Sequence, residues 1–140
     1  MYVMKVNYTN VDGGITEETL LFHMSTRDWI KADADKKPTG GYDKFIEDNI
    51  SDEQTDPVKV LTVLEDIVKR SYGFRSEDGK KFIRDPAKTE EFMDSLAYDA
   101  FLDDMLIKPG VSQDFIKNVL PKNIDVAKLE ESANASGIAP

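Results

Sequence analysis

The alternation of apolar and polar residues near the start of the chain is the feature that most restricts its fold. Apolar side chains occupy every second position over residues 2–8 and again over residues 20–24. An Asp-Gly-Gly turn at residues 12–14 separates the two runs, and glycine supplies the backbone torsions that a tight reversal needs. Because a period of two places alternate side chains on one face of a strand, we predict a β-hairpin over about residues 2–24.

Helical spacing replaces this alternation after the hairpin. Ser25 is placed to cap a short helix, with the acidic Asp28 in its first turn. A second brief helix follows a break that is rich in proline and glycine. Asp56 and Pro57 predict the start of a longer helix that runs to about residue 72, and Gly73 is expected to close it in the left-handed conformation. Its predicted core face consists of Val60, Leu61, Leu64, Ile67 and Val68.

The remaining helices are predicted from the same kind of signal. Residues 74–82 contain a Glu-Asp-Gly turn and indicate a second hairpin, and an Asp-Pro pair then starts a helix at Pro86. Ser95 is expected to divide this helical stretch in two. Ser112 is predicted to cap a last helix, which Pro121 ends.

These elements predict an α+β fold, with an N-terminal β-hairpin, a mostly helical body over about residues 26–121 and a disordered C-terminal tail. We expect residues 1–121 to form a single domain, since 140 residues are too few for two sizeable cores. Residues 122–140 lack aromatic side chains and are rich in small and polar residues. Such a segment buries too little apolar surface to offset its ordering entropy, so we expect a flexible tail.

Charge excludes several classes of function. The chain carries 27 acidic and 18 basic residues, for a formal net charge of −9. Nucleic-acid binding needs clustered lysine and arginine, so we expect no nucleic-acid partner. No apolar run is long enough to span a membrane, and residues 1–8 do not form a signal peptide. The sequence therefore predicts a soluble intracellular protein that does not bind membranes.

No catalytic, metal-binding or cofactor-binding residues are predicted. The chain has no cysteine and a single histidine, His23, which is expected to face away from the apolar side of its strand. One imidazole cannot form a two-histidine zinc site, and the glycine pairs lack the spacing of a phosphate-binding loop. The many carboxylates are expected to form a solvated acidic face. We therefore expect a protein that is not an enzyme and that needs no cofactor or metal.

Two segments are candidate partner-binding surfaces. Between residues 96 and 106 apolar side chains occupy much of the helix circumference, so a single core cannot cover them all. Tyr98, Leu102 and Met105 are the predicted anchors for a helical partner or for self-association as a homo-oligomer. The alternative is that all three fill the core of the domain.

The second candidate surface is the predicted hairpin at residues 74–82. Phe74 and Phe82 flank a loop of mixed charge that includes Arg75 and Lys80. These residues either form a recognition edge or solvate a turn, and composition alone does not distinguish the two.

Residues 71–84 resemble the tail assembly chaperones of long-tailed bacteriophages that infect Gram-positive hosts. The block has the form Ser-Tyr-Gly-Phe-Arg-Ser-Glu-Asp-Gly-Lys-Lys-Phe-Ile-Arg. The resemblance extends over about residues 4–121 through weaker matches in the same order. These matches are Lys5-Val6-Asn7-Tyr8, Asp12-Gly13, Leu20 to Met24, Glu91-Phe92, Ala97-Tyr98 and the stretch from Phe115 to Pro121.

The resemblance implies an assembly factor of the host cytoplasm that coats the tape-measure protein, keeps it soluble and recruits tail-tube subunits. An acidic exterior with a surplus apolar face fits such a role. One alternative is an acidic phage-encoded inhibitor that imitates DNA and acts on a host defence factor. A third class is an uncharacterised hydrolase, but the sequence contains no histidine-centred or cysteine-centred catalytic group that would support it.

Overall fold

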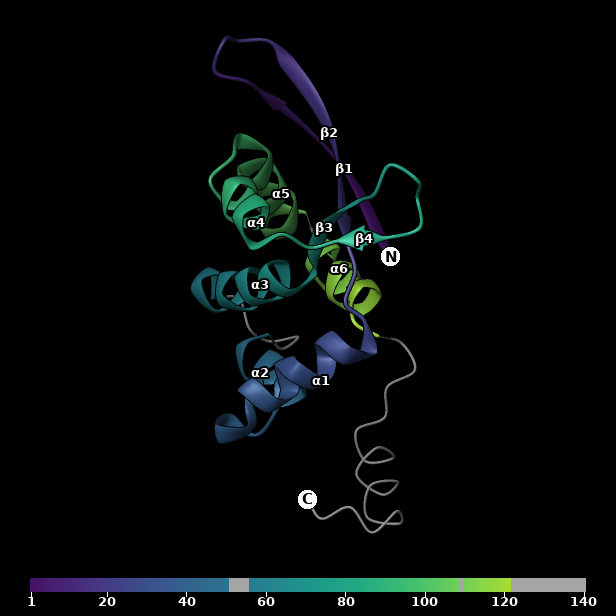
Figure 1. Ribbon diagram of the computed structural model, residues 1–140. Coiled ribbons are helices and arrows are strands. Elements are labelled where there is room, and N and C mark those ends of the chain that lie inside the picture. Colours follow the sequence, from purple (N-terminus) through teal and green to yellow (C-terminus); the bar gives the residue numbers. More distant parts are fainter. Residues whose placement is uncertain (51–55, 109, 122–140) are drawn as a thin grey trace.

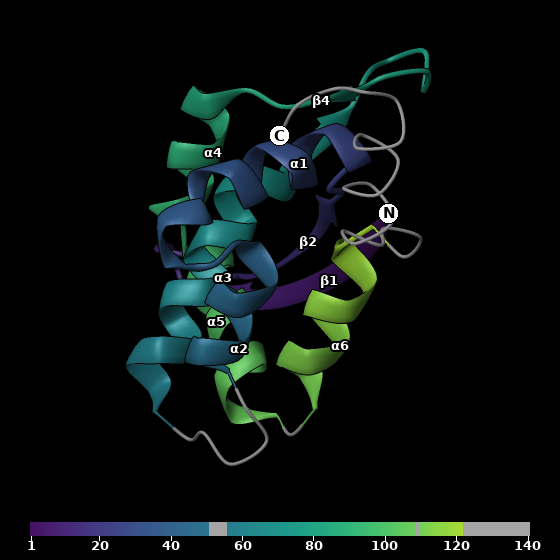
Figure 2. The same ribbon diagram turned by 90° about the horizontal axis from the view of Figure 1, so that it is seen from below.

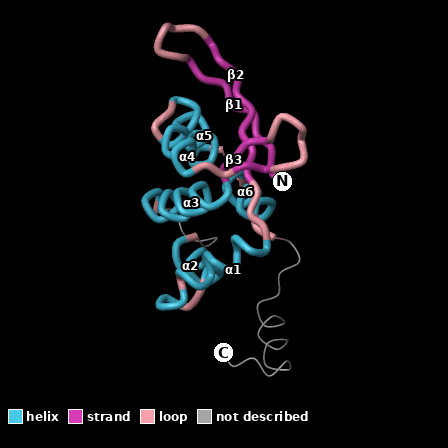
Figure 3. Tube along the Cα trace, viewed as in Figure 1, coloured by secondary structure: helices cyan, strands magenta, loops and turns pink. Residues whose placement is uncertain are grey.

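The structure is a computed structural model of the 140-residue chain, and it describes residues 1–50, 56–108 and 110–121. The fold is α+β, as the sequence predicts, with the strands gathered on one side and the helices on the other (Figures 1 and 3). The predicted tail at 122–140 lies outside the described residues. In chain order the elements are β1 (Tyr2–Thr9), β2 (Ile15–Phe22), α1 (Thr26–Asp35), the 3-10 turn η1 (Lys37–Thr39), α2 (Tyr42–Asn49), α3 (Pro57–Ser71), β3 (Tyr72–Arg75), β4 (Phe82–Ile83), α4 (Pro86–Met93), α5 (Leu96–Ile107) and α6 (Val111–Val119).

Both predicted hairpins are confirmed. Strands β1 and β2 pair antiparallel, β3 adds to β2, and β4 completes a sheet of order β1-β2-β3-β4. Figure 2 views the molecule from below and shows the helices in front of this sheet. In Figure 1 the tip of the β1–β2 hairpin projects beyond the helices. Side chains along β1 and β2 alternate between the two faces, so one face is buried against helices and the other is open to solvent.

An aromatic cluster fills the space between the sheet and the helices. Phe22 on β2 is fully buried, and its ring centroid lies 5.2 Å from that of Phe101 on α5 and 5.1 Å from that of Phe115 on α6. Tyr72 on β3 stacks on Phe92 of α4 at 4.1 Å between ring centroids. These contacts join the sheet and the helices into one core. The aromatic pairs stabilise this core beyond the burial of their apolar surface.

The helix starts predicted from caps are mostly confirmed. Ser25 and Asp28 form a reciprocal capping box, Asp56 caps α3, and Asp85 caps α4. Ser95 separates α4 from α5, as predicted, and also caps α5. The prediction for Ser112 is wrong, because α6 begins at Val111, two residues before the start that a Ser112 cap would give. Its N-cap is Gly110, whose φ of 80° lets the chain reverse sharply into the helix.

The role predicted for Gly73 is also wrong. This residue does not close α3 in the left-handed conformation but lies within β3, opposite Leu21 of β2. A Cβ added at Gly73 would lie 2.5 Å from the carbonyl oxygen of Ile83 and 2.6 Å from Cζ of Phe82. Glycine is therefore required here by the close approach of β4 rather than by a turn.

Substitution of Gly73 by alanine is expected to lower the free energy of unfolding by about 1–3 kcal/mol, because the methyl group must push the backbone of β4 away. Urea unfolding followed by circular dichroism measures the loss. The control is Gly14→Ala, where the nearest atom to an added Cβ is the flexible Asn10 side chain at 3.3 Å. Equal stability of Gly73→Ala and wild type would contradict the close packing of β3 and β4.

A polar network holds α3 against α1 and α2. Asp66 of α3 accepts hydrogen bonds from the Tyr42 hydroxyl and from Nε of Arg70, each at 2.8 Å, and Arg70 also pairs with Asp35 at 3.0 Å. Burial by itself would raise the pKa of Asp66, but the hydrogen bonds from Arg70 and Tyr42 and the charges of Arg70 and Lys36 outweigh it and lower that pKa.

This lowered pKa makes the stability of the fold depend on acidity. The folded carboxyl of Asp66 titrates below its ordinary value of 3.8, so its contribution is complete above that pH and is lost as the pH falls. We expect Asp66→Asn to reduce the difference in urea midpoint measured between about pH 6 and about pH 3. An unchanged difference in the variant would show that Asp66 does not contribute to acid unfolding.

Candidate functional site

Helix α5 buries two of the three side chains that the sequence proposed as anchors. Tyr98 is 5% exposed and Met105 is 2% exposed, while Leu102 is half-buried against the core. Strand β1 and helices α4 and α6 all contact α5, and together they cover this side of the helix. The expectation that Tyr98 and Met105 lie on an accessible face is therefore wrong. The alternative that all three residues fill the core holds for these two, whereas Leu102 is only partly buried.

The surplus of apolar residues on α5 is nevertheless real. The exposed apolar side chains of α5 are at other positions than predicted: Leu96 is 39% exposed, Leu106 is 43% exposed and Ile107 is 74% exposed. A helix that is apolar on all sides cannot bury every side chain against one core. The two most exposed of these side chains lie together at the C-terminal end of α5.

A groove opens at this end of α5, and we call it the α5 groove. It encloses about 400 Å³. Its walls come from the C-terminal end of α2, from α3 and α5, and from the N-terminal end of α6, and they include Ile50, Pro57, Val60, Met105, Leu106, Ile107, Lys108, Gly110, Ser112 and Gln113. Val58 does not line the groove, but it follows the lining residue Pro57 in the sequence and is 70% exposed. Mainly apolar walls beside exposed apolar side chains are typical of a protein-binding site.

Ile107 and Val58 were missed as candidate residues in the sequence. The usable signal for Ile107 is its position at the end of an apolar run, separated by Lys108 alone from a Pro-Gly break. Where a helix stops, its last apolar side chains extend past the elements that cover the rest of it. Val58 gives no comparable signal, because the sequence does not show that the start of α3 lies beside the end of α5.

The hairpin candidates divide between the two faces of the sheet. Phe74 is 38% exposed and lines a pocket of about 480 Å³ with Tyr72 and Phe92. Arg75 and Phe82, which face each other across β3 and β4, lie on the opposite face. Adjacent residues of a strand point in opposite directions, so Phe74 and Arg75 cannot contribute to the same surface.

Phe82 covers Gly73 on the open face of the sheet. Its ring lies 5.8 Å from the His23 ring and 5.3 Å from the guanidinium carbon of Arg84. Burial lowers the pKa of His23, and the positive charges of the N-terminus and Arg84 lower it further against the opposite effect of Asp28. Lys80 and Arg75 stay exposed at the rim of this face.

The described residues contain no group of three or more histidine, cysteine, aspartate or glutamate side chains that could hold a metal ion. The same part of the chain has no helix of sufficient length and hydrophobicity to cross a membrane. What the described surface does offer is apolar area at the α5 groove and mixed apolar and basic area on the open face of the sheet.

Comparison with known proteins agrees with the resemblance in the sequence. A search of curated proteins and a search of solved structures each gave no significant match. The family model for phage tail assembly chaperones matches residues 1–137, so it extends the resemblance at both ends and into the segment after Pro121. Because this match spans nearly the whole chain, the protein belongs to the phage tail assembly chaperone family.

Proposed function

We propose that this protein binds the tape-measure protein of its phage and keeps it soluble while tail-tube subunits are recruited around it. The proposed setting is the cytoplasm of a Gram-positive host. The single observation that supports this function best, beside the family, is the α5 groove with the exposed side chains of Leu106 and Ile107.

The α5 groove suits an apolar helix of the client protein. An amphipathic helix presents large side chains three or four positions apart, and an apolar groove takes them up out of water. The net charge of −9 keeps the complex of chaperone and client dispersed, since like-charged particles repel one another. Binding rather than catalysis is the activity that these features serve, in a family that is generally non-enzymatic.

The family also favours a chaperone over the alternative of a DNA mimic. A mimic presents rows of carboxylates over most of its surface. Residues 72–84 instead carry four basic and two acidic side chains.

Co-expression with the tape-measure protein encoded in the same phage genome tests the proposal. We expect wild-type protein to raise the soluble fraction of the tape-measure protein, and a pull-down of that complex to retain tail-tube subunits. Ile107→Asp is expected to abolish most of this effect, because a carboxylate on the groove wall opposes burial of an apolar helix.

Ile15→Asp is the matched control. Ile15 is 84% exposed on the β1–β2 hairpin, away from the groove, so its variant should solubilise the client as wild type does. Circular dichroism verifies that both variants are folded. Failure of wild type to solubilise the client would refute the proposed function, and full activity of a folded Ile107→Asp variant would exclude the groove as the client surface.

A further inference from the structure

The open face of the sheet carries a continuous apolar row. Val3 of β1 faces Leu21 of β2, and Leu21 faces Gly73 of β3, over which the ring of Phe82 lies. Val3 is 56% exposed, and Leu21 and Phe82 are half-buried. Three large apolar side chains from three strands therefore lie in one line, on the face that no described helix covers.

Positive charge borders this row at the β3–β4 hairpin. Arg75, Lys80 and Lys81 are exposed, and none of them forms an ion pair within the described residues. Arg84 differs, because it is held by the Asp28 carboxylate at 3.0 Å and by the carbonyl oxygen of His23 at 3.1 Å. Arg84 thus fixes the base of the hairpin, and the other three cations remain available.

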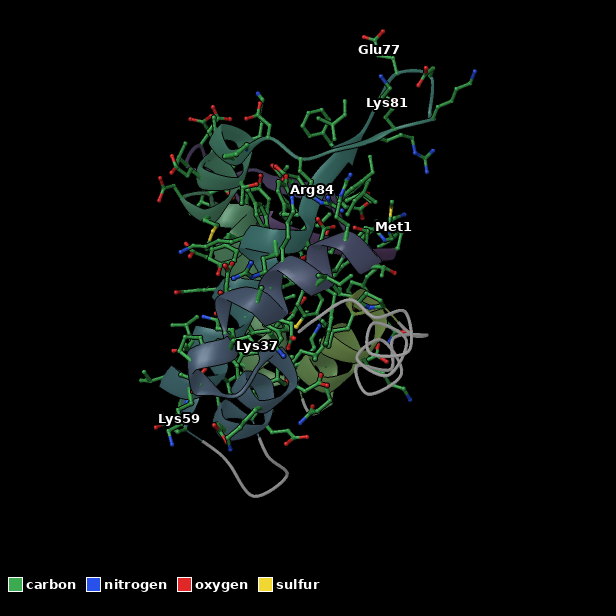
Figure 4. All side chains as sticks on the ribbon, turned by 60° about the horizontal axis from the view of Figure 1, so that its bottom comes forward. Met1, Lys37, Lys59, Glu77, Lys81 and Arg84 are labelled. Carbon is green, nitrogen blue, oxygen red and sulfur yellow. The ribbon has the colours of Figure 1, made fainter. Side chains whose placement is uncertain are left out.

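The acidic side chains of the hairpin offset these cations only in part, because residues 74–83 carry three basic and two acidic side chains. The Asp78 carboxylate accepts hydrogen bonds from the Ser76 hydroxyl at 2.6 Å and from the backbone N–H of Lys80 at 3.0 Å, so it serves the turn itself. Glu77 stands at the tip of the loop, whereas Lys81 and Arg84 lie closer to the body (Figure 4). The hairpin is therefore a local positive region on a protein of net charge −9.

We infer that the open face of the sheet, with Val3, Leu21 and Phe82 as its apolar row and Arg75, Lys80 and Lys81 as its charges, binds an acidic segment of the tape-measure protein in which carboxylates flank large apolar side chains. This inference rests on the proposed function and adds a second contact to the α5 groove. Charge complementarity selects the segment, because local potentials steer partners even when the net charge is unfavourable. Nucleic acid also carries negative charge but lacks the large apolar side chains that the row of Val3, Leu21 and Phe82 would contact, so its binding is an outcome of the test.

The positions of the two surfaces fit one long client. Figure 2 places β4 at one end of the molecule and the N-terminal end of α6, which borders the α5 groove, at the other. A long helical client that contacts both ends gains affinity through the second contact, because that contact forms at high effective concentration.

Overlapping peptides of about 20 residues, covering the tape-measure protein of the same genome, provide the test when their binding to the full chain is measured by fluorescence anisotropy. We expect some of the bound peptides to be acidic, and their affinity to fall as salt is raised. Lys80→Glu/Lys81→Glu should weaken the acidic peptides by about tenfold or more and leave the others unaffected. Both side chains are exposed and unpaired, so the double variant should fold normally.

The matched control is Lys31→Glu/Lys117→Glu, which makes the same change in net charge at exposed positions of α1 and α6, outside the residues that line the α5 groove. Equal weakening by both double variants, or unchanged binding by the hairpin variant, would overturn the inference. So would preferential binding of a single-stranded oligonucleotide at the hairpin. If wild type keeps the tape-measure protein soluble but the hairpin variant binds the acidic peptides as tightly as wild type, only the inference fails. If no peptide binds and the tape-measure protein stays insoluble, the proposed function fails as well.

Discussion

Replacement of Tyr98 by aspartate is expected to unfold the protein at room temperature. The Tyr98 ring lies in the core, with its centroid 5.2 Å from that of Phe92 and 5.9 Å from that of Phe101. An unpaired carboxylate at such a site costs about 3–5 kcal/mol, to which the lost packing of the ring adds a similar amount. The sum approaches the whole free energy of unfolding of a typical domain, about 5–15 kcal/mol. Far-ultraviolet circular dichroism and thermal unfolding measure the effect.

Two further variants test whether the loss of stability comes from the buried charge itself. They exclude that any substitution at Tyr98, or any carboxylate on α5, unfolds the protein. The Tyr98 hydroxyl has no hydrogen-bond partner within the described residues, and burial raises its pKa. Tyr98→Phe is therefore expected to leave stability unchanged or to raise it by about 1 kcal/mol. Leu96→Asp places a carboxylate at a 39% exposed position in the first turn of the same helix, where the helix dipole favours it. A Tyr98→Asp protein that melts like wild type would show that this side chain is accessible.

Phe22→Ala is expected to produce the next largest loss of stability. Phe22 is fully buried, and its ring contacts aromatic rings from β1, β3, α4, α5 and α6. Truncation of a buried phenylalanine costs about 3–5 kcal/mol, because it removes apolar burial and leaves a cavity. The corresponding fall in Tm is on the order of 10–20 °C, measured by differential scanning calorimetry.

Phe74→Ala is the comparison for this prediction. Phe74 also lies on a strand of the sheet, but 38% of it is exposed, so its truncation should cost less than about 1 kcal/mol. A Phe22→Ala protein with a Tm within a few degrees of the Phe74→Ala protein would mean that the aromatic cluster does not carry the core.

Patterns within four residues of each other were readable in the sequence because their physical cause is local. Ser25 and Asp28 cap α1 reciprocally, and Asp56 with Pro57 starts α3, through hydrogen bonds and backbone torsions of the neighbouring chain. Contacts between residues distant in the sequence are not readable in this way. Gly73 is required by strand β4, and the backbone N–H of Tyr42 at the start of α2 is capped by Asp33 from α1, nine residues away.

The candidate surfaces show the same difference between what local sequence patterns predict and what tertiary contacts decide. The sequence determined that α5 carries more apolar side chains than one core can bury, and that residues 74–82 form a charged hairpin between two phenylalanines. Only the tertiary structure decided that Tyr98 and Met105 are buried while Leu106 and Ile107 are exposed, and that Phe74 and Phe82 face opposite ways. A helix that is apolar over much of its circumference has only a weak preference for one face, so the elements that pack against it decide which side chains are buried.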